Sequence, residues 1–245
     1  MTFRLMERLG ARSGWLFALF FVSALWLSGT VASQALDVQP LRVTLEIGKG
    51  QTAGTIAVNN TGTEPMPFEV TVERRIIDEN GQQRFEPVED DFIVFPPQGL
   101  VAPGGTQAVR FQYLGEIDLT ETQGYVLRVS EVPVRDPNFS GIQFAYSFGA
   151  AIYIKPNDAT DRIQVESFER EENTVRAVLK NAGNDYSLLT AKQLRVTVGG
   201  ETLRFSRDEL TALIPNPLVS PGATRYLEIN FEDLPEGSIE SIRFD

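Results

Sequence analysis

Residues 141–156 read GIQFAYSFGAAIYIKP, and this stretch decides how the rest of the chain is interpreted. Apolar side chains occupy every even position from 142 to 154, whereas most odd positions carry small or polar residues. Alternation with a period of two is typical of a β-strand with two different faces. A strand of this length would span about 45 Å, longer than the common strand of about five or six residues. The stretch therefore predicts either a long central strand of a β domain or a strand whose aromatic first half serves a partner.

The first 35 residues have the layout of a secretory signal peptide. Arg4, Arg8 and Arg12 precede an apolar run of 13 residues, WLFALFFVSALWL at positions 15–27, and the segment ends in SQA at 33–35. This run is shorter than the roughly 20 residues that a membrane-spanning helix needs. We therefore expect cleavage after residue 35, secretion, and no stable membrane insertion of the mature chain.

The composition excludes several classes of function. Removal of residues 1–35 takes away three Arg and one Glu, which leaves 19 basic and 32 acidic residues and changes the net charge from −11 to −13. Binding of nucleic acid through a basic patch is therefore not expected. The chain has no Cys and no His, so it lacks a Cys nucleophile, a Ser-His-Asp triad, the usual zinc ligand set and disulfides. Adjacent carboxylates such as Asp90 and Asp91 remain, but neighbours on a strand face opposite ways.

From residue 36 onward the pattern is one of strands and turns. About seven predicted strands over residues 36–156, including a hairpin at Asn80-Gly81, indicate a β-sandwich. Residues 155–160 resemble a linker, and residues 157–245 indicate a second, smaller β domain. In that second part we expect a hairpin at residues 199–200 and a capping box at residues 206–209 that opens a short helix. The sequence thus predicts an all-β fold with two sandwich domains.

Four segments, in order, resemble the PapD-like periplasmic chaperones of pilus assembly. They are LRV at 41–43, FPP at 95–97 followed by LVAPG at 100–104 and VRF at 109–111, LRVSEVP at 127–133, and IKP at 154–156. The resemblance covers most of residues 40–156, and the second domain matches more loosely, through residues 178–181 and 218–222. It implies two immunoglobulin-like domains set at an angle with a cleft between them.

The resemblance also implies a function. Such chaperones lend the last strand of their first domain to a pilus subunit whose own fold lacks a strand, so that large apolar side chains fill the open groove. The residues at the donor positions here are Ile142, Phe144, Tyr146 and Phe148. This implies a periplasmic binding protein that is not an enzyme, needs no cofactor, captures a pilus or surface-fibre subunit and delivers it to an outer-membrane usher.

In this family an Arg on the first strand and a Lys on the donor strand hold the terminal carboxylate of the subunit. Arg42 matches the Arg, and a guanidinium suits a carboxylate well. The Lys position holds Ala151 instead. Lys155 shares that face but lies about 13 Å further along, and it aligns better with a basic residue that the family uses between its domains. The anchor is thus half matched, and the alternative for Arg42 is an ordinary surface arginine.

Two other classes of function remain open at this point. A structural or adhesive component of a surface fibre would share the immunoglobulin-like strand pattern. A polymerising subunit should carry a donor extension before its first strand, however, and here only residues 36–41 precede the first predicted strand. An enzyme would have to be a carboxylate-based hydrolase, and the sequence contains no motif for one.

Overall fold

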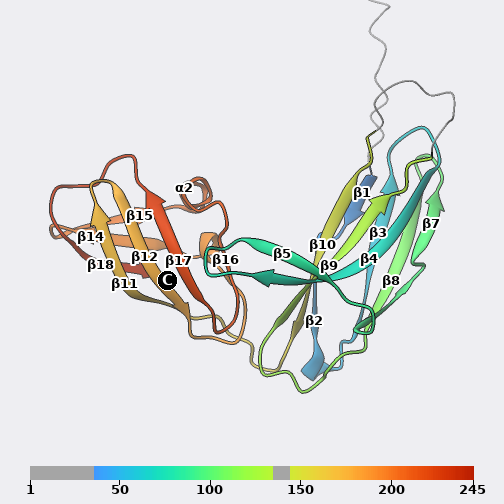
Figure 1. Cartoon of the computed structure of the whole chain (residues 1–245), viewed down its shortest axis with the longest axis horizontal. Helices are drawn as coiled ribbons and strands as arrows, with labels where there is room; N and C mark the ends of the chain where they lie inside the picture. The colour runs from blue at the N-terminus through green and yellow to red at the C-terminus, as the bar shows by residue number, and fades with distance from the viewer. Residues whose placement is uncertain (1–35, 135–143) are drawn as a thin grey trace, which may run out of the picture. The chain divides into compact units, whose positions relative to one another are not determined.

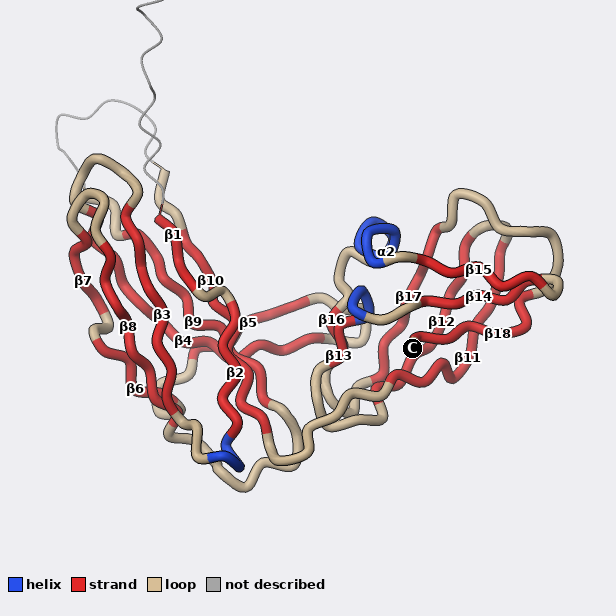
Figure 2. Tube along the Cα trace, turned by 180° about the vertical axis from the view of Figure 1, so that it is seen from behind, coloured by secondary structure: helices blue, strands red, loops and turns tan. Residues whose placement is uncertain are grey.

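The structure is a computed structural model, and it describes residues 36–134 and 144–245. The predicted signal peptide and the donor position Ile142 lie outside these residues. Nearly all of the regular structure is strand, with only short helical segments (Figure 2). No helix in the described part is long and apolar enough to cross a membrane. The prediction of an all-β fold is therefore confirmed.

The first ten strands form two sheets (Figure 1). They are β1 Leu36–Gln39, β2 Arg42–Glu46, β3 Ala53–Asn60, β4 Met66–Ile77, β5 Gln83–Pro87, β6 Phe92–Phe95, β7 Gln98–Val101, β8 Thr106–Tyr113, β9 Gln123–Glu131 and β10 Ser147–Lys155, with the 3-10 helix η2 at Ile47–Lys49. One sheet has the order β1-β3-β8-β6, and the other has the order β2-β10-β9-β4-β5 with β7 also paired to β4. The pairing of β2 with β10 is parallel.

These two sheets enclose a first hydrophobic core. Ile56 and Val109 from the four-stranded sheet and Leu127 and Ile152 from the six-stranded sheet are fully buried in it. Their side chains belong to the alternating apolar positions of the sequence, which point to one face of each strand. Apolar burial on this scale is the main stabilising contribution in a domain without disulfides.

The remaining strands enclose a second core. They are β11 Ile163–Glu171, β12 Thr174–Asn181, β13 Ser187–Leu188, β14 Leu194–Val198, β15 Glu201–Phe205, β16 Leu218–Val219, β17 Thr224–Asn230 and β18 Ile239–Phe244, with η3 at Leu189–Ala191 and the helix α2 at Arg207–Leu213. Three sheets result, with the orders β11-β12-β17, β13-β16 and β15-β14-β18. The two separate cores agree with two sandwich domains, whereas the boundaries at 36–156 and 157–245 stay a prediction.

Several local predictions are confirmed. The β4–β5 hairpin turns at Asn80-Gly81, where Gly81 has a φ of +79°, a conformation that favours glycine. The hairpin of β14 and β15 and the capping box of α2 are also present. In the capping box the backbone N–H of Ser206 donates to Glu209, and the backbone N–H of Glu209 donates to the Ser206 hydroxyl. Both motifs depend on residues close in sequence, which is why the sequence predicts them well.

Two strand predictions were wrong. Residues 36–39 do not merely precede the first strand: they form β1, which pairs with β3 in the four-stranded sheet. Pro40, which has no N–H to donate, separates β1 from β2, so the chain changes sheets there. The first domain also has ten strands instead of about seven, because β1, β5 and β7, each of four or five residues, are too short to show a clear period of two.

Candidate functional site

The described donor positions 144, 146 and 148 lie just before and at the start of β10. Phe144 and Tyr146 precede β10 and are 72% and 40% exposed, whereas Phe148, within β10, is half-buried against the first core. The following even positions, Ala150 and Ile152, are fully buried. The stretch is therefore divided: its second half is core, and its aromatic first half reaches the surface. These exposures are the ones that a donor role requires, and the role itself stays a prediction.

The expectation of one continuous strand over residues 141–156 was wrong for residues 144–146. Strand β10 begins at Ser147 because neither adjacent strand, β9 or β2, pairs with the residues that precede it. On one side β9 ends at Glu131, whose N–H donates a last ladder bond of 2.8 Å to the Tyr146 carbonyl. On the other side β2 pairs with β10 only from Ala151 onward. Residues 147–150 of β10 thus have no ladder partner on the β2 side, which leaves an open sheet edge in the described part of the chain.

Other exposed apolar side chains lie near this edge. Val132 is 39% exposed and follows Glu131, the residue bonded to Tyr146. Leu41 is 55% exposed, and its carbonyl accepts a hydrogen bond of 2.8 Å from Ala151 N–H. Exposed apolar side chains that gather beside an unpaired edge are typical of an interaction surface.

Arg42 lies at the end of this open edge. It is the first residue of β2, it is exposed, and its Cα lies opposite Ala151 of β10. Its guanidinium carbon lies 4.7 Å from the centre of the Tyr153 ring, a distance at which a cation and an aromatic face attract each other. In the part of the chain that the structure describes, no acidic side chain forms a salt bridge with Arg42.

A second arginine, Arg75 of β4, reaches the same tyrosine. Its guanidinium carbon lies 5.8 Å from the Tyr153 ring centre, and its Nη1 donates a hydrogen bond of 2.9 Å to Tyr153 Oη. Strand β9 lies between β4 and β10. Its Gly124 lies opposite Tyr153 of β10, and the neighbouring Tyr125 lies opposite Arg74 of β4. Because Gly124 has no side chain, the guanidinium can extend across β9.

Tyr153 is almost completely buried, although the alternation placed it on the polar face. Its ring packs edge-on against Tyr186 with 5.3 Å between centres. Tyr186 also covers Gly124, where an added Cβ would lie 2.8 Å from the tyrosine oxygen. Burial raises the pKa of Tyr186, which therefore stays a neutral hydrogen-bonding group at physiological pH. Arg75, Tyr153 and Tyr186 were not predicted from the sequence. The signal for Tyr153 was a large aromatic residue among mostly small ones at the odd positions of residues 141–155.

Lys155 is paired with an acidic side chain and does not lie free beside Arg42. Its ammonium forms a salt bridge with Asp185, and the two side chains are 22% and 13% exposed. The other oxygen of Asp185 accepts a hydrogen bond of 2.8 Å from the backbone N–H of Tyr186. The structure thus brings Lys155 to a turn between β12 and β13 and does not bring it to Arg42. This placement agrees with the alternative that Lys155 connects the two sandwich domains.

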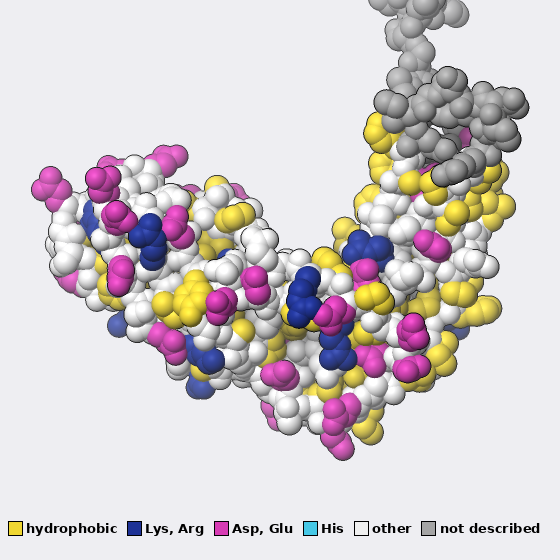
Figure 3. Space-filling model, viewed as in Figure 1, with side chains coloured by type: hydrophobic (Ala, Val, Ile, Leu, Met, Phe, Trp, Pro, Cys, Tyr) yellow, Lys and Arg dark blue, Asp and Glu magenta, His cyan; other side chains and the backbone are white. Residues whose placement is uncertain are grey.

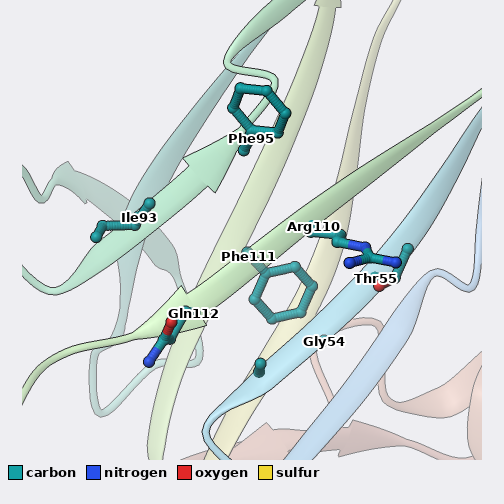
Figure 4. Close-up of a pocket in the computed structure, with 8 residues that line it drawn as sticks. Gly54, Thr55, Ile93, Phe95, Arg110, Phe111 and Gln112 are labelled. Carbon is teal, nitrogen blue, oxygen red and sulfur yellow. The ribbon is translucent and has the colours of Figure 1, made fainter.

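A separate shallow pocket of about 430 Å³ lies on the outer face of the four-stranded sheet (Figure 4). It is lined by Ala53, Gly54, Thr55, Ile93, Phe95, Arg110, Phe111 and Gln112. Gly54 is required here, because an added Cβ would lie 2.4 Å from the end of the Phe111 ring. Ile93 and Phe95 of this lining are exposed, and Figure 3 shows hydrophobic side chains scattered over the visible surface of the molecule. The pocket contains neither Arg42 nor a predicted donor residue.

Comparison with known proteins decides the family. Residues 35–159 match the family described as "Pili and flagellar-assembly chaperone, PapD N-terminal domain". The chain belongs to this family of pilus assembly chaperones. A search of curated proteins found no match.

Solved structures share the fold over most of the chain. The class 5 fimbriae chaperone CfaA is 12% identical with a TM-score of 0.58, over 86% of this chain and 98% of that one. The E. coli chaperone DraB is 18% identical with a TM-score of 0.52, over 84% and 87% of the two chains. A Salmonella enterica complex of the SafA pilin with the SafB chaperone is 16% identical with a TM-score of 0.53, over 80% and 85%. At these identities the likeness establishes the two-domain chaperone fold alone.

Proposed function

We propose that this chaperone acts in the periplasm, captures a pilus or surface-fibre subunit by donor-strand complementation, and delivers it to an outer-membrane usher. The observation that carries the proposal is the open edge of β10 with Phe144 and Tyr146 exposed just before it. An incomplete subunit exposes apolar core and an unpaired edge of its own. Pairing of the two edges satisfies both sets of backbone groups, and the aromatic side chains fill the groove.

The direction of the bound strand follows from the place of Arg42. β2 runs parallel to β10 and occupies its side from Ala151 onward. A subunit strand that adds to the free side before Ala151, parallel to β10, must end where β2 begins. Its terminal carboxylate would then meet Arg42, whereas an antiparallel strand would bring a different group there. Solved relatives include a chaperone-tip adhesin complex as well as the pilin complex, which supports subunits as the partner class.

The test is capture of a subunit. The full chain would be co-expressed, with its signal peptide, beside each secreted protein encoded next to its gene, and the periplasmic fraction would be purified through a tag on the chaperone. We expect one such protein to co-elute in a one-to-one complex and to aggregate without the chaperone. Self-assembly of the chain into fibres, with no captured protein, would overturn the proposal and favour a structural component of the fibre.

A further inference from the structure

Arg75 carries a charge for which the described part of the chain provides no counter-charge. Its Nη1 is bonded to a neutral phenol, Tyr153 Oη, and its Nε is buried without a hydrogen-bond partner. A buried donor that stays unpaired is costly, so such a group is rare unless something else binds to it. The guanidinium can therefore accept an anionic partner without losing an existing ion pair.

The neighbouring charges do not change this conclusion. Glu73 lies two residues before Arg75 on the same strand face. Its carboxylate is already held by Arg128, whose Nε and Nη2 lie 2.8 Å and 2.6 Å from the same oxygen. Arg42, in contrast, contacts the same Tyr153 ring as Arg75 and has no ion pair among the described residues. Two guanidinium groups without counter-charges thus lie around one tyrosine in a chain of net charge −11.

We propose that Arg75 is the second anchor for the terminal carboxylate of the bound subunit, and that it replaces the lysine that the family carries at the position of Ala151. This inference rests on the proposed function. Arg42 would approach the carboxylate from β2 and Arg75 from β4, with Tyr153 holding both guanidinium groups in position. A carboxylate has two oxygens and can accept hydrogen bonds from both donors at once. The same pair explains why Lys155 can be used at the domain contact instead.

The arrangement also explains Gly124. Any side chain at this position would fill the space through which Arg75 reaches Tyr153, and would collide with the Tyr186 ring. The subunit anchor would therefore depend on a glycine of β9 that touches no ligand. This gap is the feature that lets an arginine two strands away from β10 substitute for a lysine on β10.

The first experiment needs no identified subunit. Acetate is titrated into the mature chain, and the side-chain N–H signals of arginines are followed by NMR, with neutral acetamide as the control titrant. We expect the Nε signals of Arg42 and Arg75 to shift together with acetate along one binding curve and not with acetamide. The exposed Arg110 of the other sheet is the internal control and should not follow this curve. If Arg75 fails to respond while Arg42 does, the inference is wrong.

The second experiment uses the subunit captured in the test of the proposed function. Arg75→Ala should weaken binding by about tenfold or more, as Arg42→Ala does, because each leaves the carboxylate with an unpaired oxygen. The double variant should lose less than the product of the two effects, since both groups hold one carboxylate. Arg110→Ala, which changes the net charge equally, should bind like the parent. Normal capture by Arg75→Ala would overturn the anchor only, whereas failure of the parent to capture any subunit would overturn the proposed function.

Discussion

The donor segment provides the most direct quantitative test. We consider the double substitution Phe144→Glu and Tyr146→Glu. Full burial of a large apolar side chain stabilises by about 1.5–3 kcal/mol. Since Phe144 is 72% exposed and Tyr146 is 40% exposed, their partial burial in the free chain contributes together about 1–2 kcal/mol. The isolated double variant should therefore stay folded, with a modest loss of stability.

Binding should change much more. Insertion into a subunit groove would bury the remaining surface of both rings, which is worth about 2–3 kcal/mol, or about 30-fold to 150-fold in affinity. Two carboxylates forced into an apolar groove would add a further penalty. We therefore expect at least this loss of affinity, measured by titration calorimetry with the captured subunit.

The control is Ile152→Ala, which lies within β10 in the same alternating stretch but is fully buried. It should cost about 2–5 kcal/mol of folding free energy in urea unfolding, and the fraction that remains folded should bind normally. The reasoning would be refuted if the double glutamate variant unfolded, because the rings would then belong to the core. Unchanged binding by a folded double variant would refute it equally.

Two further predictions concern the ion pairs of Asp185 and Asp161. Lys155→Met should cost about 1–3 kcal/mol of stability, because it leaves the mostly buried Asp185 without its partner. It should not alter the affinity for the subunit. A loss of affinity equal to that of Arg42→Ala would make Lys155 an anchor after all. The carboxyl group of Asp161 is partly buried, which raises its pKa, but hydrogen bonds from Lys192 and Ser187 outweigh this and lower the pKa below 3.8. Its stabilising effect is therefore complete above about pH 4 and disappears as the pH falls through the lowered pKa. Asp161→Asn should reduce stability at pH 7 by about 1 kcal/mol or less, and in urea unfolding the difference should shrink as the pH is lowered below 4; a difference that stayed constant as the pH fell would contradict the assignment.

The sequence predicts best what depends on local chemistry. The glycine of the β4–β5 hairpin and the Ser206 capping box were found because turn and cap residues satisfy backbone groups within a few positions. The start of β10 could not be found in this way. Its alternation continues back to residue 142, but whether a residue belongs to a strand depends on a neighbour that pairs with it, and β2 and β9 both end too early.

The candidate site shows the same division. Arg42 could be named as a candidate from the sequence because it belongs to the segment LRV at 41–43, which resembles the family, and its role as an anchor stays a prediction. Arg75 could not, because its contact with Tyr153 joins residues 78 positions apart and depends on Gly124 between them. A pattern of period two also assigns an odd position to the polar face, and only the packing of Tyr186 makes Tyr153 a buried residue.

In the proposed complex, the parallel direction and the carboxylate anchor would together determine which subunit residues meet the donor side chains. A strand that slips by one residue turns every side chain to the other face, so an open edge alone specifies register poorly. A carboxylate held at the start of β2 would remove this freedom, because the last residue of the subunit strand would then lie just before the position opposite Ala151, which Arg42 occupies. Phe148, Tyr146 and Phe144 then lie at fixed steps back along the same edge. Loss of the arginines should therefore reduce not only affinity but also the selectivity for subunits whose apolar positions match that spacing.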